Sequence, residues 1–129
     1  MVIDSSAILA ILQQEPECVA FARAIADAPR ALLSAVNYVE CATVIESRFG
    51  PKGNSWFDDF LSDGRVEIVS IDVAIAKRAR RAYSIYGRGY HRAQLNLADV
   101  FAYALAKSLG EPLLFKGDDF RLTDVTPAL

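Results

Sequence analysis

Short, continuously apolar runs alternate along the chain with longer segments in which apolar residues recur every three or four positions. The short runs are typical of strands buried on both faces of a sheet, and the longer segments are typical of amphipathic helices. The pattern predicts strands at Val2–Ile3, Ala31–Leu33, Val66–Val69 and Leu113–Phe115, with an edge strand beginning at Val125. It predicts helices over residues 7–12, 16–28, 35–47, 56–61, 73–86 and 97–109.

Residues with special backbone preferences mark the ends of these elements. Asp4, Ser34 and Asp72 each stand just before a helix, where a side-chain oxygen can accept a hydrogen bond from the first turn. The run Gly50–Gly53 predicts a loop, and Gly110 predicts the end of a helix. We therefore expect one α/β domain over residues 1–129, in which helices sandwich a short parallel sheet of four or five strands.

Length and composition exclude several classes of protein. The chain has 129 residues, of which 53% are hydrophobic and 23% charged, as in a single globular domain. No apolar run approaches the ~18–20 residues that cross a membrane, and the acidic start argues against a secretory signal. Cys18 and Cys41 lack the paired spacing of a zinc site. We expect a cytoplasmic protein without a membrane partner, in which both thiols are reduced and buried.

The formal net charge of -2 conceals an uneven distribution. Six of the 14 basic residues lie between Lys77 and Arg92, a segment without a single acid. The other eight basic residues and all 16 acids give the rest of the chain a formal charge of -8. A cationic block in an otherwise acidic protein indicates an anionic partner.

Four acids stand where chemistry is expected. Asp4 and Asp118 follow the first and fourth predicted strands, and ligands bind outside the carboxyl ends of strands in open α/β sheets. Glu40 and Asp99 lie on helical segments that are otherwise apolar, although ionised side chains are rarely buried without a partner. Structural explanations remain open for each: helix caps for Asp4 and Asp99, a turn for Asp118, and a solvent-reaching helix edge for Glu40.

These acids would repel one another if the fold brought them together. Like charges about 4 Å apart repel by about 4 kcal/mol at an effective dielectric of 20, and such a cluster must hold protons or bind a cation. No histidine or cysteine accompanies the acids, and all-oxygen ligands favour Mg²⁺ or Mn²⁺ over zinc. Because such an ion activates water and neutralises charge on a leaving oxygen, we expect hydrolysis of a phosphodiester.

Four stretches of the sequence resemble motifs of the PIN-domain nucleases, specifically the VapC-type toxin ribonucleases of bacterial and archaeal toxin–antitoxin pairs. The stretches are Met1–Ala7, Glu40, Leu95–Ala106 and Leu113–Phe120, the last followed by Thr123–Val125. The resemblance covers essentially the whole chain and implies a cytoplasmic endoribonuclease that depends on Mg²⁺ or Mn²⁺. It also implies two partners, a VapB-type antitoxin that blocks the acidic site, commonly with a basic side chain, and a second copy in a homodimer.

The resemblance also assigns roles to residues. It implies that Asp4, Glu40 and Asp99 are catalytic and bind the metal ion. It also implies that the Ser6 hydroxyl supports the metal site by contacting these ligands rather than the ion itself.

The fourth acid departs from the family pattern. Many PIN domains carry an acid three residues before the phenylalanine, where this chain has Gly117. Asp118 or Asp119 must then supply the fourth carboxylate, and we expect Asp118 because it lies nearer the strand end.

The segment from Lys77 to Arg92 is the expected RNA-binding surface. Its cations interleave with three tyrosines, so it offers charge for phosphates and stacking surfaces for bases. The alternative is a solvated helix face whose tyrosines pack in the core. We expect Arg88 and Arg92 to bind phosphates near the metal site.

Two other functions remain open on the sequence alone. A phosphatase of the aspartyl-phosphate type would use Asp4 as its nucleophile, but its usual second acid, two residues later, is Ser6 here. An RNA-binding module that kept the fold and lost cleavage would explain Gly117, although the three other acids are retained.

Overall fold

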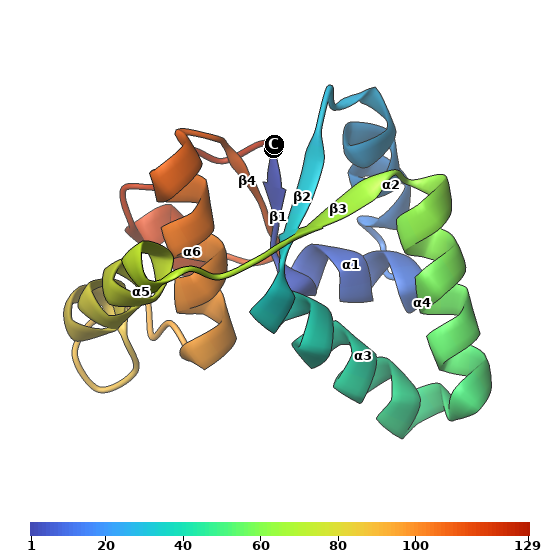
Figure 1. Cartoon of the computed structure of the whole chain (residues 1–129), viewed down its shortest axis with the longest axis horizontal. Helices are drawn as coiled ribbons and strands as arrows, with labels where there is room; N and C mark the ends of the chain where they lie inside the picture. The colour runs from blue at the N-terminus through green and yellow to red at the C-terminus, as the bar shows by residue number, and fades with distance from the viewer.

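Four short parallel strands form the centre of the fold, namely β1 Val2–Ile3, β2 Ala31–Ser34, β3 Val66–Val69 and β4 Leu113–Leu114. They lie in the order β3-β2-β1-β4 (Figure 1) in a computed structural model that describes all residues from Met1 to Leu129. The helices are α1 Ser5–Leu12, α2 Cys18–Asp27, α3 Ala35–Phe49, α4 Pro51–Asp63, α5 Val73–Tyr86, α6 Leu97–Leu109 and the short 3-10 helix η1 Asp119–Leu122. None of these helices combines the length and the hydropathy that crossing a membrane requires.

The pairing register divides the strand side chains between two cores. Val2, Leu32 and Leu113 are neighbours across the sheet and lie in the core formed with α5 and α6. The residue that follows each of them lies in the core formed with α1 to α4. Because alternate side chains of a strand point to opposite faces, helices cover both faces of the sheet, as Figure 1 shows. The expected parallel α/β sandwich is confirmed.

The junction of α3 and α4 differs from the expectation. The sequence predicts a loop at Gly50–Gly53, but only Gly50 interrupts the helices, with a left-handed φ of 64°. Pro51 begins α4, where its missing N–H would have no helical partner. Gly53 lies inside α4, where a Cβ atom would come within 2.7 Å of Ile45 Cγ2 on α3, so the close approach of the two helices requires glycine. The loop prediction is wrong because this glycine serves close helix packing.

The start of α2 lies later than the sequence predicts. The helix begins at Cys18 rather than at Pro16, because residues 16 and 17 form a turn. Cys18 is therefore only partly buried, whereas Cys41 is buried as expected, and both thiols are free.

The C-terminal segment lies beside β4 without forming the edge strand that the sequence predicts from Val125. A single bridge pairs Leu113 with Pro127, and the Val125 side chain is buried in the core with α6. The Tyr103 hydroxyl donates a 2.6 Å hydrogen bond to Asp124, which holds the segment against α6.

Candidate active site

Asp4 is the most enclosed of the predicted site residues. It follows β1 and caps α1, and only 2% of its surface is exposed. Its Oδ2 accepts hydrogen bonds from the Ser6 amide at 2.9 Å and from the Ser6 hydroxyl at 2.5 Å. Burial, together with the charges of Asp99 and Glu40, raises the pKa of Asp4 to about 7, although the hydrogen bonds from Ser6 oppose this shift. Asp4 therefore titrates near neutral pH.

Asn37 on α3, which the sequence pattern does not single out, connects three elements at Asp4. Its Nδ2 lies within hydrogen-bonding distance of Asp4 Oδ1 (3.4 Å), Ser5 Oγ (2.9 Å) and the Ala98 carbonyl oxygen (3.3 Å). Its Oδ1 accepts a 2.5 Å hydrogen bond from the Ser34 hydroxyl. The side chain has no exposed surface, so it ties the end of β1 to the starts of α3 and α6. The sequence offers one signal for this role: Asn37 is an amide side chain in an otherwise apolar helical segment, and a buried amide needs hydrogen-bond partners.

Asp99 has two roles at the start of α6. Its Oδ2 accepts a 2.8 Å hydrogen bond from the Asn96 amide, and its own amide donates to Asn96 Oδ1 at 2.9 Å, so the pair forms a capping box. Burial raises the pKa of Asp99, and the charges of Glu40 and Asp119 add to the rise, while the Asn96 amide and Arg88 lower it. Asp99 therefore interacts electrostatically with the other acids even though it also caps α6.

Glu40 lies at the rim of this group. Its side chain on α3 is partly exposed and lines an open, largely apolar groove that continues to the start of α6. Its charge nevertheless contributes to the raised pKa values of both Asp4 and Asp99. Glu40 therefore lies at a helix edge that reaches solvent, and its charge still acts on Asp4 and Asp99.

The two candidates for the fourth acid have different environments. The Asp118 side chain is 94% exposed, and its Oδ1 lies 3.8 Å from the Arg121 guanidinium. Asp119 is instead the acid whose charge contributes to the raised pKa of Asp99. The chain turns at Gly117, where φ is 90°, so nearness to the strand end along the chain is not nearness to the site. Of the two candidates, Asp119 is therefore the one whose charge acts on Asp99, while the only ion pair of Asp118 is with Arg121.

Lys116 connects the loop after β4 to α1 and to the turn that follows α1. Its amide donates a 3.0 Å hydrogen bond to Ser6 Oγ, and that hydroxyl donates in turn to Asp4. Its ammonium group forms an ion pair with Glu15 and lies 3.4 Å from Glu17 Oε2, both in the turn between α1 and α2. The sequence gives no sign of this contact, because the partners are far apart along the chain.

The chemistry of these acids fits a hard cation. The acids that act on one another, Asp4, Glu40, Asp99 and Asp119, offer only oxygen donors, which suit Mg²⁺ or Mn²⁺. No three histidine, cysteine, aspartate or glutamate side chains stand close enough to form a metal-ligand group as placed. Burial and mutual repulsion both disfavour the charged carboxylates, and a divalent cation between them would offset that cost.

The two predicted phosphate-binding arginines are placed differently. Arg88 stands in the α5–α6 connection, where its amide donates a 3.1 Å hydrogen bond to the Leu95 carbonyl oxygen. Its positive charge lowers the pKa of Asp99. Arg92 is exposed and has no ion-pair partner.

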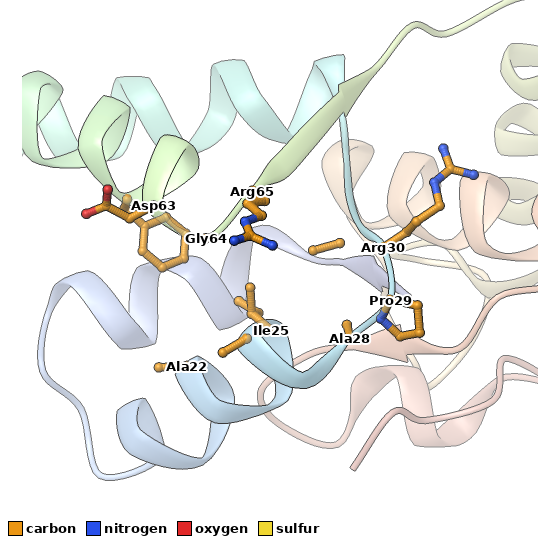
Figure 2. A pocket seen from close by; sticks show the side chains of 11 residues that line it. Ala22, Ile25, Ala28, Pro29, Arg30, Asp63, Gly64 and Arg65 are labelled. Atoms are coloured by element: carbon orange, nitrogen blue, oxygen red, sulfur yellow. The ribbon is translucent and has the colours of Figure 1, made fainter.

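A hollow of about 540 Å³ (Figure 2) lies at the amino ends of β2 and β3, whereas Asp4 follows the carboxyl end of β1. Ile25 of α2 and Phe60 of α4 contribute apolar lining, with Arg30 and Arg65 beside them. Its lining contains a single acid, Asp63. Because this hollow lacks a group of acids, the candidate active site is at the carboxyl edge of the sheet.

A model of the PIN domain matches residues 1–125. The chain belongs to the PIN-domain family. One similar PIN protein is Ribonuclease VapC of Mycolicibacterium smegmatis, 52% identical over 125 residues that cover 97% of each chain. Another is Ribonuclease VapC30 of Mycobacterium tuberculosis, 46% identical over 97% of this chain and 95% of that one.

Solved structures of three other proteins share the fold. Mycobacterium tuberculosis VapC20, described as a toxin that cleaves the sarcin–ricin loop, gives a TM-score of 0.74 at 16% identity over 98% of both chains. A toxin–antitoxin complex from Klebsiella pneumoniae gives 0.71 at 18% identity, covering 92% of this chain and 88% of that one. VapBC2 of Rickettsia felis, bound to promoter DNA, gives 0.75 at 14% identity, covering 98% and 95%. The expected PIN fold and the resemblance to VapC-type toxins are confirmed.

Proposed function

We propose that this PIN domain is a metal-dependent endoribonuclease and acts as the toxin of a VapBC-type toxin–antitoxin pair. The observation that carries the proposal is the position of Asp4, which is buried at the carboxyl end of β1, where the charges of Glu40 and Asp99 from distant parts of the sequence contribute to its raised pKa. A relative 52% identical over nearly the whole chain is called a ribonuclease, which supports RNA hydrolysis as the reaction. Neither of the two relatives described above is called a phosphatase.

Mg²⁺ or Mn²⁺ is the proposed cofactor. Asp4, Asp99 and Glu40 would hold the ion, and Asp119 takes the place of Asp118 as the fourth acid. A bound ion of this kind supplies an activated water and neutralises charge on the scissile phosphate. Because Asp4 must lose its proton to ligate a metal, we expect metal affinity to rise as the pH passes about 7.

Hydrogen bonds to the protein orient the two most enclosed acids before an ion binds. Ser6 donates twice to one oxygen of Asp4, and Asn37 approaches the other. The Asn96 amide holds Asp99 in the same way. Fixed ligands lower the entropic cost of forming the site, because less side-chain motion is lost on binding.

RNA is the proposed substrate, and Arg88 is the proposed first contact outside the metal site. Its guanidinium group lies near enough to act on the charge of Asp99, so it can bind a phosphate next to the scissile one. Arg92, which is exposed, would extend this contact along the strand.

The proposed protein partners are a VapB-type antitoxin and a second copy of this chain, in the cytoplasm. The relatives called VapC and the shared fold of the two complexes support an antitoxin partner. A basic side chain of the antitoxin would enter the acidic site and replace the charge of the metal ion.

Cleavage of total bacterial RNA by the purified, antitoxin-free protein tests the proposed activity. We expect cleavage with Mn²⁺ or Mg²⁺, and none with EDTA or in the Asp99→Asn variant. Asp63→Asn, an exposed acid at the opposite edge of the sheet, is the matched control and should cleave normally. Cleavage that persists in EDTA would contradict metal dependence. Binding of RNA without any cleavage by the wild type would favour the RNA-binding module.

A further inference from the structure

The exposed side of α5 carries cations that the proposed active site does not use. Lys77, Arg80, Arg81 and Ser84 stand at positions i, i+3, i+4 and i+7 of the helix, and therefore share one face. They line a small hollow of about 250 Å³ that contains no apolar residue. No basic residue between Lys77 and Arg92 forms an ion pair, so these charges are free to meet a partner.

A chain of shallow grooves leads from this face to the acids. The hollow on α5 shares Arg80 with a groove lined by Tyr83 and Leu97. Tyr83 and Leu97 also border the hollow that contains Arg88. Leu97 in turn borders the groove that contains Glu40. Neighbouring grooves therefore share residues all the way from α5 to the candidate active site.

Two exposed tyrosines stand along this path. Tyr83 and Tyr90 are 37% and 69% exposed, and their rings meet edge to face with centroids 5.9 Å apart. Exposed aromatic rings beside free cations are the combination that binds single-stranded nucleic acid, in which bases stack and phosphates pair with charge. An acidic protein segment would use the cations but would leave the aromatic faces without a matching partner.

We propose that this path binds the RNA strand as it leaves the active site, with phosphates on Lys77, Arg80 and Arg81 and bases on Tyr83 and Tyr90. The inference rests on the proposed ribonuclease function and adds the course and the length of the substrate. The cations lie beyond Tyr83 on this path, and Lys77 is about 9 Å from Tyr83 along the helix axis, so only an RNA longer than the one that fills the active site reaches them. Longer RNA gains these contacts and binds more tightly.

Equilibrium binding of labelled oligouridylate in EDTA, where the proposed chemistry is inactive, tests the path. The variant Lys77→Gln/Arg80→Gln/Arg81→Gln removes the three cations. The control, Arg23→Gln/Arg48→Gln/Lys52→Gln, removes the same charge from exposed cations on α2, α3 and α4. Probes of about 20 and about 4 nucleotides bracket the site sizes of about 4–16 nucleotides seen in single-strand-binding folds.

We expect the α5 variant to bind the long probe at least about tenfold more weakly than the control variant near ~0.1 M salt. Its slope of log K against log salt should fall by about 2, since each single-strand phosphate contact contributes about 0.7. The short probe should bind both variants alike. Equal loss of long-probe binding in the two variants would overturn the proposal, because net charge alone would then explain it.

A second competitor separates RNA from an acidic protein. Polyglutamate of about 20 residues should displace the long probe much less effectively than unlabelled oligouridylate of the same length, because it offers no bases to the tyrosines. Equal displacement would overturn the assignment to RNA and favour an acidic protein segment. Since none of these measurements requires cleavage or a metal ion, failure of the path and failure of the proposed ribonuclease activity are distinguishable.

Discussion

The starts of α1 and α5 carry the same sequence signal and have opposite environments. Asp4 and Asp72 each follow a strand and cap a helix, accepting hydrogen bonds from first-turn amides at 2.9 Å and 2.8 Å. Asp4 is buried among other acids, whereas Asp72 is exposed. The strand order explains the difference, because β1 lies between β2 and β4 while β3 is at the edge of the sheet. A capping aspartate becomes a candidate ligand only where neighbouring elements enclose it.

The largest expected effect is on RNA cleavage by the two capping variants. Asparagine caps a helix about as well as aspartate, so Asp4→Asn and Asp72→Asn should both fold. We expect Asp4→Asn to lower the single-turnover cleavage rate at least about 100-fold, equivalent to about 2.7 kcal/mol, because a metal ligand is lost. Asp72→Asn should stay within about twofold of the wild type. Similar losses of cleavage rate in both variants would contradict the claim that Asp4, and not Asp72, is a metal ligand.

The pH dependence of folding separates the same pair. The pKa of Asp4 is about 7 in the folded protein and 3.8 in its unfolded reference state, so the folded chain holds this proton more tightly. The stabilisation is complete below about pH 4 and is lost as the pH rises through about 7. Without metal, the wild type should lose about 2–3 kcal/mol relative to Asp4→Asn between about pH 5 and pH 8.

Urea unfolding in EDTA measures this difference. The Asp72→Asn variant controls for the loss of a capping carboxylate, because Asp72 caps α5 from an exposed position. If the free energies of unfolding of the wild type and Asp4→Asn change in parallel with pH, burial does not raise the pKa of Asp4.

A smaller effect concerns the side chain that encloses Asp4. Removing the amide in Asn37→Ala takes one hydrogen bond from each of the buried Ser5 and Ser34 hydroxyls and from Asp4 Oδ1, and should cost about 1–3 kcal/mol. Asn96→Ala, which removes only an exposed helix cap, should cost about 1 kcal/mol. Free energies of unfolding from urea titrations compare the two, and an Asn37→Ala loss below that of Asn96→Ala would contradict the connecting role of Asn37.

The smallest effect is expected at Lys116. Lys116→Met releases the loop after β4 from the α1–α2 turn and should weaken Mn²⁺ binding about tenfold, since groups that orient ligands affect metal affinity by about 10–100-fold. Lys107→Met is the matched control, because Lys107 has a similar exposure and forms an ion pair with Asp124 away from the acids. Unchanged Mn²⁺ affinity in Lys116→Met would show that the ion pairs of Lys116 do not affect the metal site.

Local signals account for much of the fold. The caps at Asp4, Ser34 and Asp72, and the C-terminal stop at Gly110, are all present because each depends on a residue and its nearest neighbours along the chain. The run Gly50–Gly53 misleads because the same residue type serves either a turn or close helix packing. The choice between them depends on how closely α3 packs against α4, which the sequence does not report.

The candidate site shows the same limit. Asp4, Glu40 and Asp99 are recognisable because each is a charge in apolar surroundings. The choice between Asp118 and Asp119 depends on the direction of the chain after Gly117, and sequence distance from the strand end does not report it. Contacts such as Asn37 with Asp4 join segments that meet only after folding.

Calorimetric titration of the metal-free protein with Mn²⁺ near pH 8 tests the central claim most directly, namely that acids from separate segments form one metal site. The account predicts that Asp4→Asn, Glu40→Gln, Asp99→Asn and Asp119→Asn each weaken binding at least about tenfold. Asp72→Asn and Asp118→Asn should bind Mn²⁺ like the wild type. Wild-type affinity in Asp4→Asn or Asp99→Asn, or a loss in Asp118→Asn equal to that in Asp119→Asn, would contradict the account.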